Sequence, residues 1–392
     1  MLERTAHAID RPDLPPHLRR LVYGFWSLLR DQPTQRGEAE LVAAIVAHKW
    51  FRPGRLRVNR LRRWLAPAEM DPTPYRWAVP ELPTVAALAT WLDVEPSELL
   101  WLADLRGTAD HYLRRWSGSR LIEAPRNRLK RVQRALAGGL LSAIPVHEAA
   151  HGFCARRSVL TAVTPHSGQP MVVAFDLQKF FQSIRASRVH ALFRTAGYPR
   201  DAARVLAGLC TTTTPDEVCD GWTVNPRPFH RARHVPQGAP TSPAIANLSA
   251  FGLDRRLSGL AGRLGAYYTR YADDLLFSGP RSLGRRAFAG LVESIVCEEG
   301  FALNPVKTRA MGQASRQLAL GLVLNDRPRL PRRERELLEA TLVNCVRRGP
   351  DGQNRTGGTS FRERLAGRVA WARQVEPEFG ERLEALYQEI AW

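Results

Sequence analysis

The sequence predicts an α+β fold, because strand patterns and helical patterns alternate along most of its 392 residues. The run MVVAFDL at 171–177 is apolar up to an acid, which is typical of a buried strand. Two aromatic-rich runs that meet at a tight turn predict a β-hairpin at 266–279. Helical periodicity before, between and after these strands predicts helices layered on a sheet. An apolar fraction of 44% suffices for a sizeable core and excludes a wholly disordered chain.

The N-terminal part of the chain, 1–83, predicts a helical and basic extension. Apolar clusters recur with helical spacing over 17–66, and five prolines within 67–83 predict a loop. An arginine-rich run in this part could bind the phosphate backbone of an RNA. The alternative is that these arginines only form the solvated face of a helix. The arginines that we expect to contact RNA are Arg57, Arg60 and Arg63.

The rest of the chain predicts short strands and amphipathic helices in mixed order. Apolar spacing of about 3.6 residues predicts the helices, and short apolar or alternating runs predict the strands. Further strands are expected at 112–116, 119–125, 301–312 and 316–325. Helices are expected at 84–94, 97–107, 127–144, 187–197, 199–213, 242–265 and 285–300, and over the last 60 residues outside 349–360. Ser97 is expected to cap the second of these helices.

The formal net charge of +19 is the strongest compositional signal. Only four of the 57 basic residues are lysine, a ratio typical of a GC-rich coding sequence, but the size of the charge indicates a polyanionic partner such as nucleic acid. No apolar run approaches the roughly 18 residues that span a bilayer, and the first residues lack the apolar segment of a secretory signal. Five scattered cysteines without a CxxC pair indicate neither a disulfide framework nor a zinc site. We therefore expect a cytoplasmic protein with no membrane partner.

Three aspartates form the candidate reaction centre. Asp176 ends the apolar strand, and Asp273 and Asp274 follow 97 residues later at the turn of the hairpin. Burying an unpaired carboxylate is costly, and adjacent carboxylates repel unless a cation lies between them. Carboxylates from neighbouring strands suit a pair of Mg²⁺ ions, which activate an attacking hydroxyl and stabilise leaving pyrophosphate. The alternative is an ordinary turn that happens to use Asp-Asp.

Five motifs in a fixed order resemble those of reverse transcriptases. Tyr271-Ala272-Asp273-Asp274 resembles their YADD box, and FDLQKFFQSI at 175–184 resembles the motif that carries their first metal-binding aspartate. VPQGAPTSPAIANL at 235–248 is similar to the motif that shapes the nucleotide pocket. NPVKTR at 304–309 and LGLVLN at 320–325 are similar to the later palm motifs.

The flanking segments resemble bacterial retron-type reverse transcriptases over roughly 84–392. The similar segments are SRLIEAPRNRLKRVQRAL, VHEAAHGF, RRSVLTAV and the C-terminal FRERLAGRVAWARQVEPEFGERLEALY.

Two signatures of retron enzymes differ in this chain. Where retron enzymes carry Asn-Ala-x-x-His, this chain has Ala162 in place of the asparagine and keeps His166. Where they carry Val-Thr-Gly, it reads Ala319-Leu320-Gly321. The differences bear on the partner RNA and on the mode of priming.

The resemblance implies a right-hand polymerase with a helical N-terminal extension. The implied parts are the extension at 1–83, the fingers at 84–170, the palm with the YADD hairpin at 171–325 and the helical thumb at 326–392. The implied reaction is RNA-directed DNA synthesis with two Mg²⁺ ions and deoxynucleoside triphosphates. The implied partners are a noncoding RNA that serves as template and primer, its single-stranded DNA product and an effector protein, and the implied role is antiphage defence.

The resemblance also assigns roles to single residues. Asp176, Asp273 and Asp274 bind the metal ions, with Asp274 the less direct ligand. Phe181 acts as a steric gate against ribonucleotides, or alternatively packs in the core beside Phe180; on a strand, these two rings would point to opposite faces.

Other implied roles concern substrate binding. Gln237 and Gly238 contact the incoming nucleotide and the template, and Arg120 contacts its triphosphate through a planar guanidinium. Lys307 is one of only four lysines and lies in NPVKTR, so we expect its ammonium to protonate the leaving pyrophosphate or, alternatively, to bind phosphate passively. The primer grip contains Leu320 and Gly321. His166 contacts RNA or serves in packing.

Three functions remain open at this point. The first is a retron reverse transcriptase that copies its own noncoding RNA. The second is another defence-associated reverse transcriptase that makes protein-primed or untemplated DNA, which the altered signatures favour. The third is a nucleic-acid-binding scaffold without polymerase activity, which the intact set of three aspartates disfavours.

Overall fold

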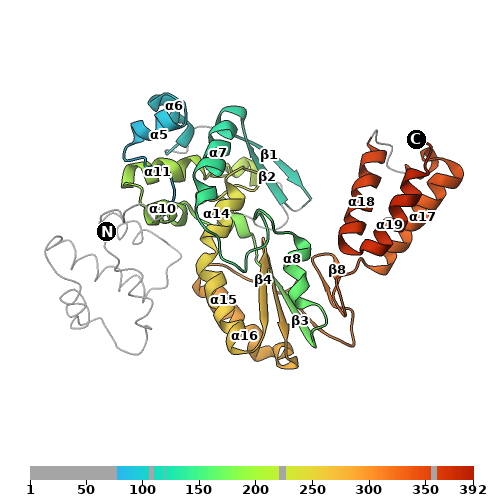
Figure 1. Cartoon of the computed structure of the whole chain (residues 1–392). Helices are drawn as coiled ribbons and strands as arrows, with labels where there is room; N and C mark the ends of the chain where they lie inside the picture. The colour runs from blue at the N-terminus through green and yellow to red at the C-terminus, as the bar shows by residue number, and fades with distance from the viewer. Residues whose placement is uncertain (1–76, 106–109, 119, 220–226, 355–359) are drawn as a thin grey trace. The chain divides into compact units, whose positions relative to one another are not determined.

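The computed structural model describes residues 77–105, 110–118, 120–219, 227–354 and 360–392 (Figure 1). The chain divides into Met1–Asp71 and Pro72–Trp392, and all described residues belong to the second unit. The predicted basic extension, with Arg57, Arg60 and Arg63, lies outside the described residues. No helix in the described ranges is long and apolar enough to cross a bilayer.

A four-stranded antiparallel sheet lies at the centre of this unit. Its strands, in spatial order, are β4 (Tyr267–Tyr271), β5 (Asp274–Gly279), β3 (Met171–Asp176) and β6 (Arg309–Gly312). The apolar strand β3 is therefore paired on both sides. Its sequence lacks the alternation of a half-solvated strand because both of its faces are covered, with Val173 and Phe175 in one hydrophobic core and Ala174 packed against another. The predicted α+β class, the buried strand and the β4–β5 hairpin are confirmed.

The two faces of the sheet belong to two separate hydrophobic cores. Leu275 and Phe277 of β5 point into the first core with helices α15 (Phe251–Arg263) and α16 (Arg286–Glu298). Leu276, between them, points into the second core, because successive side chains of a strand face opposite sides. Figure 1 shows α15 and α16 on one side of the strands and α8 (Val159–Val163) on the other.

The segment before the sheet forms a hairpin backed by helices. Strands β1 (Tyr112–Ser117) and β2 (Arg120–Pro125) pair antiparallel, as predicted, and α7 (Asn127–Gly139) follows them. Helices α5 (Val85–Trp91) and α6 (Pro96–Ala103) precede them. The predicted Ser97 cap is wrong. Proline is favoured at the first helical position, so the helix starts at Pro96, and Glu95 is the N-cap residue.

The described part of the connection from β3 to β4 contains six short helices before α15. They are α9 (Phe180–Ser183), α10 (Ala186–Thr195), α11 (Arg200–Leu209), α12 (Asp216–Cys219), α13 (Arg227–His230) and α14 (Ser242–Ser249). The single helix expected at 242–265 is instead two helices, α14 and α15, because the backbone opens at Ala250, where ψ is 0°.

The C-terminal region is helical, as predicted. Helices α17 (Arg332–Arg348), α18 (Phe361–Val375) and α19 (Pro377–Gln388) share the second core with a small hairpin of β7 (Leu318–Ala319) and β8 (Leu322–Val323). The strand expected at 301–312 is confined to β6. Leu303 forms an isolated antiparallel bridge with Leu177. Pro305 lacks a backbone donor, and the chain turns at 305–307 before the regular pairing of β6 begins.

Candidate active site

The three predicted aspartates lie together at one end of the sheet. Asp176 is the last residue of β3 and pairs in register with Asp274, the first residue of β5. Ala272 and Asp273, hereafter the aspartate turn, connect β4 to β5, because Tyr271 pairs with Asp274. The Asp273 carbonyl accepts a hydrogen bond of 2.8 Å from Leu177 N–H, which joins the turn to the end of β3. Asp274 thus begins the strand, which corrects the expectation that both adjacent aspartates lie in the turn.

The electrostatics of these carboxyl groups favour a bound cation. Burial raises the pKa of Asp274 to about 6, and the negative charges of Asp273 and Asp176 contribute to this rise. Burial, with the charge of Asp176, also raises the pKa of Asp273. Carboxylates are the hard oxygen ligands that Mg²⁺ prefers, and a divalent cation would relieve their repulsion. The donor set therefore fits a magnesium site.

Two basic side chains oppose this negative charge. Lys307, in the turn that precedes β6, donates a hydrogen bond of 2.6 Å to Asp176 Oδ1, and this bond raises the lysine pKa. The backbone beside it is tied down as well, because Asn304 N–H donates to the Asp176 carbonyl at 2.8 Å. Arg120 is exposed at the start of β2. Its positive charge is near enough to offset part of the rise in the pKa of Asp273 and Asp274.

A buried polar network lies beneath the aspartate turn. Arg270 of β4 forms a bidentate ion pair with Asp254 of α15, with Nε–Oδ1 and Nη2–Oδ2 distances of 2.7 and 2.6 Å. Its Nη1 donates to Asn247 Oδ1 and to the Ala272 carbonyl, both at 3.0 Å. The break between α14 and α15 lies between Asn247 and Asp254, and both residues reach the same guanidinium. This network was not predicted from the sequence, although an arginine within a buried hairpin strand signals a buried partner.

The segment 146–153 supports the same turn from another side. His151 N–H donates to the Arg270 carbonyl, and Arg270 N–H donates to the Ala149 carbonyl, both at 2.7 Å. Asn247 Nδ2 donates to the Gly152 carbonyl at 2.8 Å. A Cβ atom on Gly152 would lie 2.6 Å from Ala272 N, so the turn packs on a position that only glycine allows.

Gln237 and Gly238 lie against strand β2. The Gln237 carbonyl accepts a hydrogen bond of 2.8 Å from Glu123 N–H, and its side chain accepts one of 3.5 Å from Gln182 Nε2. Gly238 has φ +125°, and a Cβ atom there would lie 3.1 Å from Ile122 Cγ2. The loop that contains Gln237 and Gly238 therefore contacts the β1–β2 hairpin, which carries Arg120.

Comparison with known proteins decides the family. The model of the reverse transcriptase (RNA-dependent DNA polymerase) family matches residues 114–324. The chain belongs to the bacterial retron-type reverse transcriptases. The retron Mx162 and Mx65 reverse transcriptases of Myxococcus xanthus are 38% and 39% identical over 79% and 69% of this chain. The retron Ec86 reverse transcriptase of Escherichia coli is 32% identical over 53% of it. The matches cover 67%, 61% and 58% of the lengths of these three relatives.

Phe181 of this reverse transcriptase is the more exposed of two adjacent aromatic residues, Phe180 and Phe181. Phe180 and Phe181 lie in helix α9 rather than on a strand, so the opposite faces of a strand do not separate their rings. Both rings pack on the first core, Phe180 within it and Phe181 against it. Phe180 is 3% exposed in the first core, whereas Phe181 is half-buried, with its ring centroid 6.1 Å from that of Phe153. The steric gate stays a prediction.

His166 is an interior residue of this reverse transcriptase. Its side chain lies against β4 and β5, and the residue is 0% exposed. Its Nδ1 and Nε2 atoms lie 2.7 Å from Ser278 Oγ and 2.8 Å from Thr269 Oγ1. Burial lowers its pKa to about 3, so the ring is neutral. This placement corrects the expected RNA contact, because the side chain has no exposed surface, and it agrees with the packing alternative.

The predicted primer-grip residues form the turn of the β7–β8 hairpin. Leu320 and Gly321 have φ of +49° and +82°, and Gly321 is exposed. Leu320 packs on the second core, which also contains the C-terminal helices. The turn is therefore anchored on one side and open on the other.

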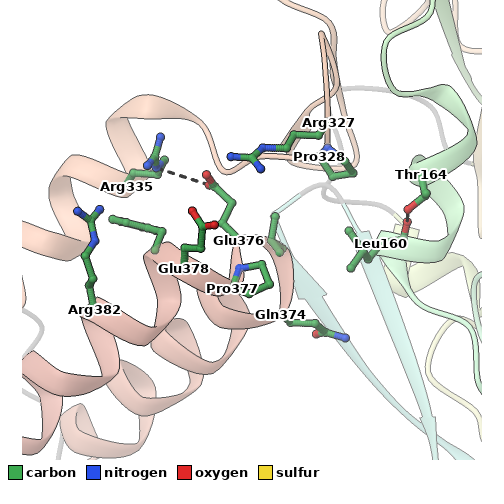
Figure 2. Close-up of a pocket in the computed structure, with 12 residues that line it drawn as sticks. Leu160, Thr164, Arg327, Pro328, Arg335, Gln374, Glu376, Pro377, Glu378 and Arg382 are labelled. Atoms are coloured by element: carbon green, nitrogen blue, oxygen red, sulfur yellow. Dashed lines mark hydrogen bonds and ion pairs between the residues drawn. The ribbon is translucent and has the colours of Figure 1, made fainter.

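A cavity of about 730 Å³ has none of the three aspartates among its lining residues, which Figure 2 shows. It is lined by Leu160 of α8 and by arginines from the C-terminal region, Arg327, Arg335 and Arg382. Figure 2 shows Arg335 directed at Glu376, and the ion pair between their Nε and Oε1 atoms measures 3.5 Å. The cavity contains none of the aspartates, so it is not the reaction centre.

Proposed function

We propose that this reverse transcriptase copies part of a cognate noncoding RNA into single-stranded DNA and acts in antiphage defence with an effector protein. The observation that carries the proposal is the in-register pairing of Asp176 with Asp274, next to Asp273 in the turn. Three buried or half-buried carboxylates from adjacent strands form the donor set that phosphoryl transfer with two metal ions requires.

In the proposed reaction, a primer hydroxyl attacks the α-phosphate of a deoxynucleoside triphosphate and pyrophosphate leaves. Two Mg²⁺ ions, when bound, activate the hydroxyl and stabilise the leaving group. Asp176 and Asp273 hold these ions, and Asp274 contributes less directly. Lys307 lies 2.6 Å from Asp176 and is 52% exposed on its side chain, so it can turn from the carboxylate to the leaving phosphate.

Substrate selection is proposed to depend on the loop and hairpin beside the aspartates. Arg120 has an exposed guanidinium whose charge reaches the aspartates, which suits a triphosphate bound between them. Gln237 and Gly238 contact the nucleotide and template, and Phe181 excludes a ribose 2′-hydroxyl. Leu320 and Gly321 support the primer end.

The RNA is proposed to contact the protein mainly through phosphates. Arg327 and Arg382, at the C-terminal cavity that also contains the Arg335–Glu376 ion pair, supply positive charge for such contacts, in addition to the predicted contacts of the N-terminal arginines. Protein-primed or untemplated synthesis is the second candidate. The observation that favours it is Ala162, which stands where retron enzymes carry asparagine and is 0% exposed.

The test is to purify the protein from cells that carry its native locus and to sequence the bound nucleic acid. Wild type is compared with Asp273→Asn and with the control Asp216→Asn, whose carboxylate forms an exposed ion pair with Arg231. We expect one discrete RNA in all three samples, joined to complementary DNA in wild type and control only.

Two other outcomes would contradict this proposal. DNA of low complexity without a matching RNA would support protein-primed or untemplated synthesis. RNA without DNA in every sample would support the scaffold function.

A further inference from the structure

A second group of ligating side chains lies away from the aspartates. Glu123, His230 and His234 each offer one ligand atom, and these atoms all lie within 4.8 Å of one another. All three residues are buried, with exposures of 0%, 1% and 0%. Among the described residues, no other three His, Cys, Asp or Glu side chains come this close. We call them the Glu–His–His cluster.

The cluster joins three separate segments. Glu123 lies in strand β2, and His230 is the last residue of α13. His234 follows after three residues and is fixed by paired backbone hydrogen bonds with Thr212, both of 2.9 Å. Two histidines separated by three residues have a spacing that is common in zinc sites, and a carboxylate from another segment is a frequent third ligand.

Hydrogen bonds determine which ring nitrogen of His234 is free of a proton and can accept a bond. Its Nδ1 lies 2.9 Å from the Ala232 carbonyl, which only accepts, so Nδ1 carries the proton. In the neutral ring, Nε2 then presents a lone pair to Glu123 Oε2 at 3.0 Å. Two acceptors at that distance require a proton or a cation between them.

The same reasoning applies to His230. Thr214 Oγ1 donates to Glu123 Oε1 at 2.8 Å, so its only proton is used. His230 Nδ1, 3.3 Å from this hydroxyl oxygen, is therefore the donor to it. The remaining nitrogen, Nε2, is buried and has no hydrogen-bond partner among the described residues. It presents an unused lone pair in the interior.

We propose that the Glu–His–His cluster binds one divalent transition-metal ion, of which Zn²⁺ is the best match. Two imidazole nitrogens and one carboxylate oxygen are suitable zinc ligands, and both histidines use Nδ1–H to donate to an oxygen, as ligating histidines usually do. Arg114 Nε, 3.3 Å from Glu123 Oε1, and Thr214 both engage the other carboxylate oxygen. Oε2 is thereby left to face His234.

The proposed ion would brace the nucleotide-binding region and take no part in catalysis. Glu123 N–H donates to the Gln237 carbonyl at 2.8 Å. Strand β2, which supplies a metal ligand, therefore also holds the loop of Gln237 and Gly238 that is proposed to contact the nucleotide. His234 lies only three residues before Gln237 in the chain. An ion in the cluster would therefore fix β2 relative to that loop from both sides.

The first test measures bound zinc by mass spectrometry in the full-length protein after dialysis against metal-free buffer. Wild type is compared with His230→Gln and Glu123→Gln. The matched control is His111→Gln, which changes a 5% exposed histidine whose Nε2 lies 2.8 Å from the Trp101 carbonyl. We expect about one zinc per chain in wild type and control, and at least a tenfold lower content in the two cluster variants. Equal zinc contents in all four proteins would overturn the proposal.

The second test uses unaltered protein, because a substitution in the interior can prevent folding. The metal is removed with a chelator and Co²⁺ is added. We expect the intense visible absorption of a nitrogen-ligated cobalt site, its loss on addition of Zn²⁺, and a higher midpoint of thermal unfolding with Zn²⁺ than with Mg²⁺ alone. If Co²⁺ gives no visible absorption and Zn²⁺ does not shift the midpoint, Glu123 and His234 share a proton instead of a metal ion. That result would overturn the proposal.

Discussion

Arg270 and Asp254 form a bidentate ion pair in which both side chains are 0% exposed, directly beneath the aspartate turn. Burying two charges is costly unless the remaining donors and acceptors are satisfied. Here Tyr268 donates to Asp254 Oδ1 at 2.9 Å, and the third nitrogen of Arg270 donates to Asn247 and to the Ala272 carbonyl. The pair therefore does more than stabilise the core, because it determines where the turn with Asp273 lies.

We predict that Arg270→Lys destabilises the protein and slows polymerisation. A single ammonium cannot make both contacts to Asp254 and also reach Ala272, so a buried group is left unpaired. The expected loss in the free energy of unfolding is about 3–5 kcal/mol, measured by urea denaturation. Because Arg270 acts through the turn, the variant should also require more Mg²⁺ for half-maximal primer extension.

The control for this prediction is Arg256→Lys. Arg256 pairs with Glu298 and Glu299 at 2.6 and 3.0 Å, but its side chain is 31% exposed. An ion pair of this kind contributes about 0–1 kcal/mol, so the control should be close to wild type in stability and in its Mg²⁺ requirement. Equal losses in the two variants would refute a special role for the buried pair.

We predict that Gly152→Ala disturbs the aspartate turn. The added Cβ would lie 2.6 Å from Ala272 N, a backbone atom that cannot rotate away. Overpacking of this kind costs about 1–3 kcal/mol and should lower the rate of DNA synthesis. The control Gly262→Ala, in α15, has nothing within 4 Å of the added atom and should be neutral or slightly stabilising. A fully active Gly152→Ala variant would show that the turn tolerates displacement.

We predict that Lys307→Arg lowers the rate of single-nucleotide incorporation by about 10²-fold, measured by rapid quench. Arginine keeps the positive charge next to Asp176 but cannot release a proton at neutral pH. The control is Lys130→Arg in α7, which makes the same change far along the chain from the aspartates. A Lys307→Arg variant that incorporates nucleotides as fast as wild type would assign Lys307 to passive phosphate binding.

The sheet and its aspartates could be predicted because their signals are local. The strand before Asp176 and the hairpin around Asp273 each have a pattern that is readable within about ten residues. The supports of these aspartates could not be predicted, because Arg270 meets Asp254 and Asn247 only after two helices pack on the strands.

The interior histidines show the same limit. The spacing of His230 and His234 is visible in the sequence, but their approach to Glu123 depends on how β2 packs. His166 lies in a family signature that suggests an RNA contact, whereas its burial is a property of the folded chain. Sequence patterns indicate which residues carry chemistry more readily than they indicate which polar groups become buried.

The burial of His166 predicts a specific dependence of stability on pH. Its pKa is lowered from 6.5 to about 3 by burial, so the unfolded chain binds a proton more readily than the folded one. The stability that this histidine contributes is complete above pH 6.5 and is lost as the pH falls from 6.5 toward 3. At about 1.4 kcal/mol per pH unit, the expected loss in the free energy of unfolding between pH 6.5 and 5 is about 2 kcal/mol.

Urea denaturation of wild type and His166→Gln at pH 7 and pH 5 isolates this contribution of His166, because the other titrating groups are common to both proteins. The stability difference between them should shrink by about 2 kcal/mol at pH 5, and an unchanged difference would mean that His166 becomes protonated in the folded state.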